Sequence, residues 1–188
     1  MVIDEAYHYF YAPTFMPLIK KYDNLLILRT FSKLFSIAGL RIGYVSGKAE
    51  LIEYIEKAES TFNVNNIAIL FAQGVIRNRQ PISRLIDTEH AGRIWIVEKL
   101  KGAGYQTIVM EGNYVLFLPK KDPKIIVEKL KKEKIWVRDY SNGIPKGWIR
   151  VSTCSITCMK KFWDTFNQIS LQDGRRESCC ICCTHFIL

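Results

Sequence analysis

The sequence predicts an α/β protein: part of a large parallel or mixed β-sheet domain, followed by a small α+β domain. Three observations lead to this prediction. Up to about residue 78, short apolar runs are separated by loops and amphipathic helical patterns, as in a sheet that packs against helices. From residue 79 to 171, the pattern changes to a long helix and then short strands. The first part also has too few strands to form a complete doubly wound domain.

The first part should contain three strands and two helices. Val2 and Ile3 form a short buried strand whose polar end begins at Asp4, and Leu25 to Leu28 form a second. Residues 39–45 read as a third strand, with glycines where the backbone must approach a neighbour closely. We expect amphipathic helices at residues 48–60 and 66–78, because their apolar residues recur at helical spacing.

The second part begins with a long helix that Pro81 opens and that ends near Lys101, before Gly102 and Gly104. Strands are expected at residues 106–110, 114–118, 135–138 and 148–152, with a helix at 123–132. A closing helix follows, marked by apolar residues spaced three or four apart: Ile156, Met159, Trp163, Phe166 and Ile169.

Composition is that of a globular protein rather than a disordered chain, a collagen-like fibre or a simple disulfide scaffold. Of 188 residues, 48% are hydrophobic and 24% charged. The sequence has no apolar run long enough to span a bilayer, and Asp4 and Glu5 follow the start too soon for a signal peptide. These features predict a cytoplasmic protein without membrane contact.

The cysteines are unevenly distributed. Cys154 and Cys158 lie in the body of the chain, which favours a reducing compartment, and the other four lie beyond residue 172. We expect residues 172–188 to be a disordered or artefactual tail outside the fold. Zinc or iron-sulfur ligation and palmitoylation remain alternatives for this tail, but its adjacent cysteines converge poorly on one ion, so no metal site is predicted.

An excess of Lys and Arg, 27 against 18 Asp and Glu, gives a net charge of +9 and invites a nucleic-acid interpretation. The densest cationic run, residues 129–134, falls on an expected amphipathic helix. No nucleic-acid-binding motif accompanies it. The run therefore favours a solvated helix face over a binding surface.

Polar side chains follow the first two expected strands, at the point where each strand ends. In an α/β sheet, ligands bind outside the carboxyl ends of the strands, so these groups would face one cleft. The set comprises a carboxylate, a phenol, two hydroxyls, an amine and a guanidinium, supplied by Asp4, Tyr7, Thr30, Ser32, Lys33 and Arg41.

Such groups suit a phosphorylated aromatic aldehyde, pyridoxal 5'-phosphate. The amine of Lys33 can form a Schiff base with the aldehyde, and Asp4 can keep the pyridine nitrogen protonated. Tyr7 can donate to the ring oxygen, while Arg41 and the two hydroxyls can hold the phosphate. Taken alone, the Asp4-Glu5 pair also fits a helix N-cap.

The same residues carry a resemblance to fold-type I aminotransferases, and among these most to the histidinol-phosphate aminotransferases. The motifs are residues 2–7 (VIDEAY), 29–33 (RTFSK) and 38–44 (AGLRIGY), with the arginine eight positions beyond the lysine. Residues 113–117 (NYVLF), 137–139 (VRD) and 148–152 (WIRVS) extend the resemblance, which runs from residue 1 to about 170.

This resemblance implies a pyridoxal-phosphate-dependent aminotransferase of class I/II that is a homodimer at full length. Lys33 would be both the Schiff-base lysine and the base that moves the substrate proton. Asp4 and Tyr7 would contact the cofactor ring, and Ser32 and Arg41 would hold its phosphate.

The resemblance also implies two substrate-binding arginines. Arg150 would bind the carboxylate of an amino donor such as glutamate, whose partner is a 2-oxo acid. Arg138 is a candidate for a second anionic group, as in a phosphorylated substrate. From alternation alone, Arg150 either faces solvent or is paired in a site.

In the family, about half of the chain precedes the position of Asp4, so we expect this chain alone to bind the cofactor weakly and to have little activity. A second departure is residues 153–155 (TCS), where many members have a glycine-containing turn.

Two other functions remain open. One is a pyridoxal-phosphate-dependent decarboxylase or lyase of a phosphorylated amino acid, and the other is a non-catalytic basic module that binds anions or nucleic acid.

Overall fold

The computed structural model describes residues 1–10, 13–78 and 80–172. The chain forms two compact units: Met1–Thr88 with Glu111–Asn113, and Glu89–Met110 with the chain from Tyr114 onward. The division falls inside one long helix, α3 (Gln80–Gly102). The boundary expected at residues 78 and 79 stays a prediction. Of the expected tail, residues 173–188 lie outside the described part.

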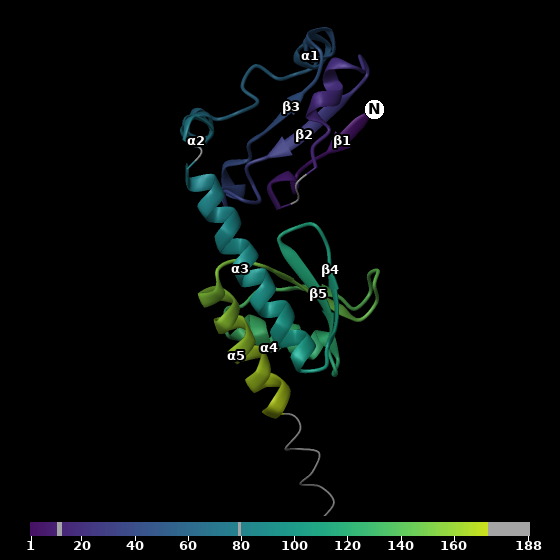
Figure 1. Ribbon diagram of the computed structural model, residues 1–188, viewed down its shortest axis with the longest axis vertical. Helices are drawn as coiled ribbons and strands as arrows, with labels where there is room; N and C mark the ends of the chain where they lie inside the picture. Colours follow the sequence, from purple (N-terminus) through teal and green to yellow (C-terminus); the bar gives the residue numbers. More distant parts are fainter. Residues whose placement is uncertain (11–12, 79, 173–188) are drawn as a thin grey trace, which may run out of the picture. The chain divides into compact units, whose positions relative to one another are not determined.

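Unit 1 is built on a mixed three-stranded sheet in the order β1-β2-β3 (Figure 1). Strand β1 (Val2–Asp4) runs parallel to β2 (Leu26–Thr30), and β3 (Gly43–Ser46) runs antiparallel to β2. The three expected strands of this unit are therefore present, although β3 begins later than expected, and the sheet is mixed rather than wholly parallel. Because β1 and β2 are parallel, they end at the same edge, and β3 begins there.

The predicted third strand is wrong in its first half. A 3₁₀ turn, Ala38–Leu40, occupies that half, and Arg41 adopts the left-handed conformation at φ 53° before β3 starts at Gly43. A glycine is needed at position 43, because a Cβ there would lie 2.7 Å from the carbonyl oxygen of Arg29. The sequence pattern AGLRIGY therefore encodes a turn that leads into a strand.

Two helices follow β3: α1 (Ala49–Glu56) and α2 (Asn66–Arg77). The side chain of Asn65 caps α2 by accepting a hydrogen bond from the amide of Ala68. The apolar cluster of this region is small, with four buried members: Phe31, Ile42, Ala68 and Ala72. Short 3₁₀ turns, His8–Phe10 and Met16–Lys20, complete unit 1.

Unit 2 contains a four-stranded antiparallel sheet in the order β4-β5-β7-β6. The strands are β4 (Gln106–Val109), β5 (Tyr114–Leu118), β6 (Arg138–Tyr140) and β7 (Trp148–Ser152). Helices α4 (Pro123–Lys132) and α5 (Ile156–Gln172) accompany the sheet. The fold is thus α/β, with one mixed and one antiparallel sheet.

The strand predicted at residues 135–138 is displaced to β6. Lys134 has a positive φ of 59°, and the amide of Ile135 still donates to the carbonyl of Leu130 in α4. These residues close the helix, while Ile135 and Val137 pack against the core. Residues 135–137 thus connect α4 to β6 without pairing to another strand of the described chain. Pairing with β7 begins only at Arg138.

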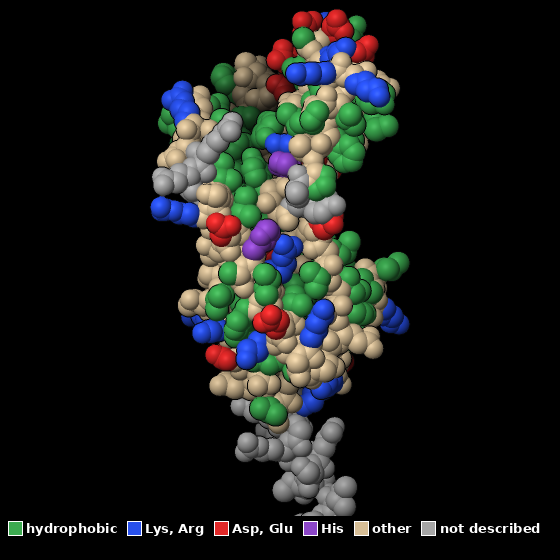
Figure 2. All heavy atoms as spheres, viewed as in Figure 1, with side chains coloured by type: hydrophobic (Ala, Val, Ile, Leu, Met, Phe, Trp, Pro, Cys, Tyr) green, Lys and Arg blue, Asp and Glu red, His purple; other side chains and the backbone are tan. Residues whose placement is uncertain are grey.

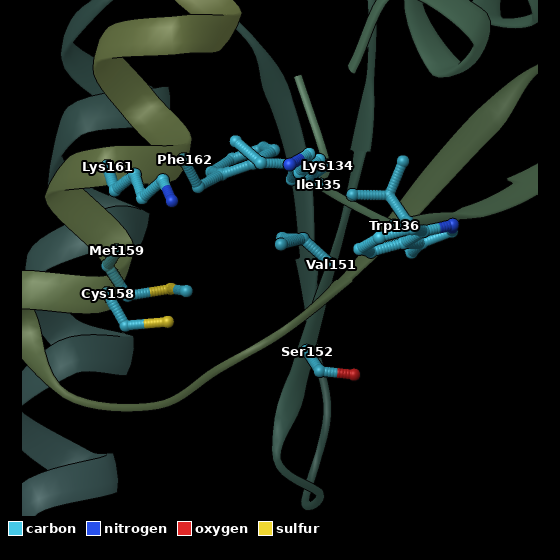
Figure 3. Close-up of a pocket in the computed structure, with 10 residues that line it drawn as sticks. Lys134, Ile135, Trp136, Val151, Ser152, Cys158, Met159, Lys161 and Phe162 are labelled. Atoms are coloured by element: carbon cyan, nitrogen blue, oxygen red, sulfur yellow. The ribbon is translucent and has the colours of Figure 1, made fainter. Parts of the chain in front are cut away.

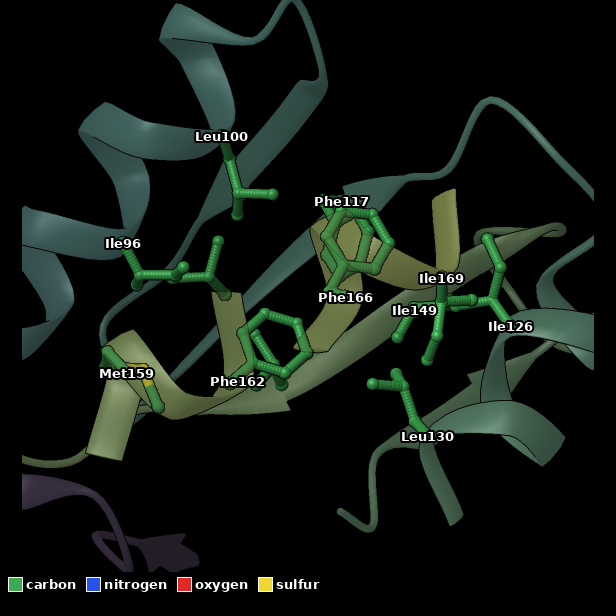
Figure 4. Packing of buried hydrophobic residues seen from close by; sticks show 12 residues of the cluster. Ile96, Leu100, Phe117, Ile126, Leu130, Ile149, Met159, Phe162, Phe166 and Ile169 are labelled. Carbon is green, nitrogen blue, oxygen red and sulfur yellow. The ribbon is translucent and has the colours of Figure 1, made fainter. Parts of the chain in front are cut away.

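Aromatic rings fill the core of unit 2 between the sheet and the helices (Figure 4). Phe166 is fully buried, with ring centroids 5.1 Å from Phe117 and 5.8 Å from Phe162. Ile96 and Leu100 of α3 join the same cluster. Fully burying a large apolar side chain contributes about 1.5–3 kcal/mol, so we expect this cluster to be the main source of stability in unit 2.

Two features bear on the compartment and on the positive charge. The structure joins Cys154 and Cys158 in a disulfide, which the reducing-compartment interpretation did not anticipate. On the face in Figure 2, acidic side chains gather over α1, whereas Lys and Arg are spread over many elements rather than along one stripe. The helices in the described part of the chain include none with the length and apolar character needed to cross a bilayer.

Candidate functional site

Most of the predicted site residues lie at one edge of the unit 1 sheet. Asp4 is the last residue of β1, and Thr30 is the last residue of β2. Thr30 pairs with Gly43, the first residue of β3, two positions after Arg41. Parallel pairing of Asp4 with Leu28 therefore puts the carboxylate and the β2 terminus beside each other.

Lys33 and Tyr7 meet at this edge. The Nζ atom of Lys33 lies 5.1 Å from the centroid of the Tyr7 ring, and both side chains are half-buried. The two residues leave different strands, so their proximity is tertiary rather than local. A primary amine is the side-chain group that condenses with a carbonyl, and Lys33 places one at this edge of the sheet.

Asp4 and Thr30 order the backbone where each strand ends. Oδ1 of Asp4 accepts a hydrogen bond from the amide of Ala6 at 2.9 Å. Oγ1 of Thr30 accepts one from the amide of Ser32 at 3.1 Å. The exposed Asp4 carboxylate thus forms a short turn rather than the helix N-cap that was the alternative.

Arg41 presents an exposed guanidinium next to β3. Its left-handed backbone follows the Ala38–Leu40 turn, and Nη1 donates to the carbonyl of Ala38 at 3.2 Å. The remaining guanidinium donors suit the oxygens of an anion such as a phosphate.

A buried ion pair lies directly next to these residues in sequence, and sequence reasoning assigned it no role. The Nη2 atom of Arg29 is 2.9 Å from Oε2 of Glu5, and Glu5 is only 8% exposed. Thr14 donates to both carboxylate oxygens, and the amide of Phe15 donates to Oε1 at 2.6 Å. A cation within an otherwise largely apolar strand, three positions before a serine, was the available signal.

The environment of this pair shifts the pKa values of Glu5 itself and of the nearby His8. Burial acts to raise the pKa of Glu5, but hydrogen bonds from the Phe15 amide, Arg29 and Thr14 outweigh it, so the pKa is lowered. Burial, aided by the charge of Arg29, lowers the pKa of His8. The carboxylate and a neutral imidazole are thus the favoured states at neutral pH.

The two predicted substrate arginines are neighbours in the sheet of unit 2. Arg138 of β6 and Arg150 of β7 are Cα partners, so their side chains emerge on one face. The guanidinium carbon of Arg150 lies 5.1 Å from the Tyr114 ring centroid. Its Nε is buried, and within the described residues no acceptor binds it. Two like charges placed opposite each other repel, and an anion between them would relieve that repulsion.

A cavity of about 260 Å³ opens elsewhere in unit 2, between α5 and the segment that precedes β6 (Figure 3). Its walls are largely apolar, with Trp136, Val151 and Phe162 among them, and Lys134 and Lys161 also line it. The predicted site residues do not line it, so the volume of this cavity does not locate the chemistry.

The chain matches the family model described as aminotransferase class I and II over residues 1–163. It is 31% identical over 156 residues to the histidinol-phosphate aminotransferase of Gluconacetobacter diazotrophicus, covering 81% of this chain and 44% of that protein. It is 33% identical over 157 residues to histidinol-phosphate aminotransferase 1 of Dechloromonas aromatica, covering 81% and 43%. The chain therefore spans less than half the length of these relatives.

Solved structures share the fold. Histidinol-phosphate aminotransferase from Clostridium acetobutylicum aligns with a TM-score of 0.81 at 24% identity, covering 91% of this chain and 54% of that one. The Sinorhizobium meliloti enzyme in complex with pyridoxal-5'-phosphate gives 0.80 at 22%, covering 91% and 48%. L-threonine-O-3-phosphate decarboxylase from Porphyromonas gingivalis gives 0.75 at 21%, covering 89% and 54%. Because the family model spans most of its sequence, the chain belongs to the class I and II aminotransferases.

Proposed function

We propose that this chain carries the cofactor lysine and the substrate arginines of a pyridoxal-phosphate-dependent transaminase. Its substrates would be an amino acid or a phosphorylated amine resembling histidinol phosphate, with glutamate and 2-oxoglutarate as the amino donor pair. One observation carries the proposal: the Lys33 amine lies 5.1 Å from the Tyr7 ring, at the sheet edge where Asp4 ends β1. Family membership supports it.

The residues at this edge fit pyridoxal 5'-phosphate. An amine, a carboxylate and a phenol come from Lys33, Asp4 and Tyr7, and the exposed guanidinium of Arg41 and the hydroxyls of Thr30 and Ser32 offer donors for a phosphate. When bound, the cofactor supplies an electron sink that stabilises negative charge at the substrate α-carbon. Asp4 would keep the ring nitrogen protonated, and the Tyr7 hydroxyl would donate to the ring oxygen.

Lys33 would have two roles. Its amine would hold the cofactor aldehyde before substrate arrives and, once displaced by the substrate amine, Nζ would carry a proton to and from the substrate carbon. The Tyr7 ring centroid lies 5.1 Å from Nζ. This contact would help to keep the released amine near the reacting atoms.

Arg150 and Arg138 would select the anionic groups of the substrate. The cross-strand pairing of the two arginines places two guanidinium groups on one face, which suits a substrate with two acidic groups or a phosphate. We propose that Arg150, with its buried Nε, binds the carboxylate of the amino donor, and that Arg138, which is exposed, binds a second anion.

A decarboxylase or lyase of a phosphorylated amino acid is the second candidate. Its support is the structural similarity to L-threonine-O-3-phosphate decarboxylase. The substrate in that name carries a carboxylate and a phosphate, two anionic groups that the pair of arginines could bind. Both candidates use Lys33, so product analysis separates them. Amino transfer converts 2-oxoglutarate to glutamate, whereas decarboxylation releases carbon dioxide and leaves 2-oxoglutarate unchanged.

For the whole protein we propose a cytoplasmic homodimer. The family resemblance supports both parts of this proposal, whereas the Cys154–Cys158 disulfide is not what a reducing compartment favours. Because the chain spans 43–47% of its curated relatives, the complete site and its activity belong to the proposal rather than to the described residues.

The test is the visible absorbance of the chain mixed with pyridoxal 5'-phosphate. Because the chain alone is expected to bind the cofactor weakly, we expect a faint band from the lysine-bound cofactor that appears only at high cofactor excess, and borohydride reduction should fix the added mass on the peptide that contains Lys33. Lys33→Ala should abolish both signals. Lys20→Ala, which removes an exposed lysine of the same unit, should keep both. A band that survives Lys33→Ala would refute the assignment.

A further inference from the structure

The Glu5–Arg29 pair is part of a hydrogen-bonded network that spans all three strands of unit 1. Glu5 directly follows β1, and its amide extends the ladder by donating to the carbonyl of Leu28. Arg29 lies in β2 and is the Cα partner of Tyr44 in β3. Nη1 of Arg29 is 3.4 Å from the hydroxyl of Tyr44. One guanidinium of β2 therefore connects a residue of β3 with the residue that directly follows β1.

A loop residue completes the network. Nη2 of Arg29 donates to Oγ1 of Thr14 at 2.8 Å, and Thr14 in turn donates to the Glu5 carboxylate. Nε of Arg29 also donates to Oε2 of Glu5, at 3.0 Å. The side chains of Arg29 and Glu5 are only 11% and 6% exposed. Charge-assisted bonds of this kind are strong and directional when partners are desolvated.

The network and the candidate cofactor groups alternate along the chain. Glu5 immediately follows Asp4, and Arg29 immediately precedes Thr30. Successive residues of a strand point to opposite faces of the sheet. The network therefore lies on the face opposite Asp4 and Thr30, at the edge where these residues leave their strands.

We propose that the Glu5–Arg29–Thr14 network is a positioning device for the candidate cofactor site. This inference rests on the proposed function, because the spacing that it would fix is that between Asp4 on β1 and the turn from Thr30 to Lys33 after β2. From the opposite face of the sheet, Arg29 fixes the distance between the ends of β1 and β2. The candidate cofactor-binding groups would then be in position before the cofactor binds. None of the three residues would touch the cofactor.

The test compares Glu5→Gln with the wild-type chain in titrations with pyridoxal 5'-phosphate. Gln keeps the shape but leaves the buried Arg29 charge unpaired. We expect the affinity of the chain for the cofactor to fall by about tenfold. Losses of this size occur in metalloproteins when a residue that orients a metal ligand is removed. Thr14→Val should also weaken binding, and Thr14→Ser, which keeps the hydroxyl, should restore it.

A second measurement does not need the cofactor. Amide hydrogen exchange at Ala6 and Ser32 reports the turns formed by Asp4 and Thr30 on the opposite face. We expect faster exchange at both amides in Glu5→Gln. Leu100→Ala, a core variant in unit 2, should lose stability without changing either exchange rate or cofactor affinity.

The outcomes separate the two proposals. If Glu5→Gln lowers only the melting temperature, leaving cofactor affinity and the two amides unchanged, the pair is merely structural and the inference is wrong. If the wild-type chain shows no Lys33-dependent cofactor band even at high cofactor excess, the proposed function fails, while the exchange rates still decide whether the network orders the strand ends.

Discussion

Unit 1 and unit 2 are held together in different ways. Among the described residues, unit 2 has a cluster of twelve buried apolar residues, with stacked and edge-on phenylalanine rings at its centre. Unit 1 has four such residues in its cluster, two of them alanines. Its strand ends are joined instead by a buried ion pair and the hydrogen bonds around it.

This difference follows the placement of the predicted chemistry. The edge with Lys33 and Asp4 belongs to the unit with the small apolar cluster, whose helix α2 also exposes large side chains such as Leu70 and Phe71. Apolar burial stabilises without regard to direction, whereas hydrogen-bonded charges fix particular atoms. A site that needs groups at set distances gains more from the second kind of interaction.

Phe166→Ala should have the largest effect. Removing a fully buried ring from the centre of unit 2 costs about 3–5 kcal/mol, because the lost transfer free energy is compounded by a cavity. Urea unfolding followed by tryptophan fluorescence measures it, since all four tryptophans lie in unit 2. Trp136→Phe, at a position 72% exposed, is the control and should change stability by less than about 0.5 kcal/mol. An equal loss in both variants would show that the cluster is not the main source of stability.

The next largest effect on stability is expected from a matched pair of glycine-to-alanine variants in two helices. A Cβ on Gly92 of α3 would lie 1.7 Å from the carbonyl oxygen of Cys154, whereas a Cβ on Gly74 of α2 would have open space around it. Gly92→Ala should therefore destabilise unit 2 by about 1–3 kcal/mol through overpacking. Gly74→Ala should stabilise α2 by about 0.5–1 kcal/mol. Thermal melts that moved both variants in the same direction would contradict this packing difference.

Much of the fold follows from the sequence because periodicity and capping act locally. The limits of β5, α4 and β7 agree with the apolar patterns, and Asn65 and Asp122 cap the helices that they precede. The two strand errors have a common cause. At Arg41 and Lys134 the backbone enters the left-handed region, and side-chain hydrophobicity carries little information about that conformation.

Less of the candidate site could be predicted, because its geometry depends on contacts between distant segments. The motifs identified Lys33, Asp4 and Tyr7 as chemical groups, but the contact between Lys33 and Tyr7 appears only when two strand ends meet. The pairing of Arg138 with Arg150 depends on the register of β6, which the sequence placed too early. Glu5 and Arg29 were overlooked because each resembles an ordinary polar neighbour of a motif until burial is known.

Acid should weaken unit 1 before unit 2, and this is the smallest effect that we expect. Hydrogen bonds that outweigh burial hold the pKa of Glu5 below its ordinary value of 4.5, so its stabilisation is present above that value and is lost as pH falls through the folded-state pKa. Burial and Arg29 lower the pKa of His8 below 6.5, so protonation of this imidazole also favours unfolding as pH falls below 6.5. The two groups therefore act in the same direction.

Amide exchange of β1–β3 and of β4–β7, measured between pH 7 and pH 4, should show protection declining first in the former. In His8→Phe the decline should begin at lower pH, since of these two groups only Glu5 would remain. Loss of protection in both sheets at one pH would mean that the polar network contributes no acid sensitivity of its own, and that the contrast between the two units lies in their packing alone.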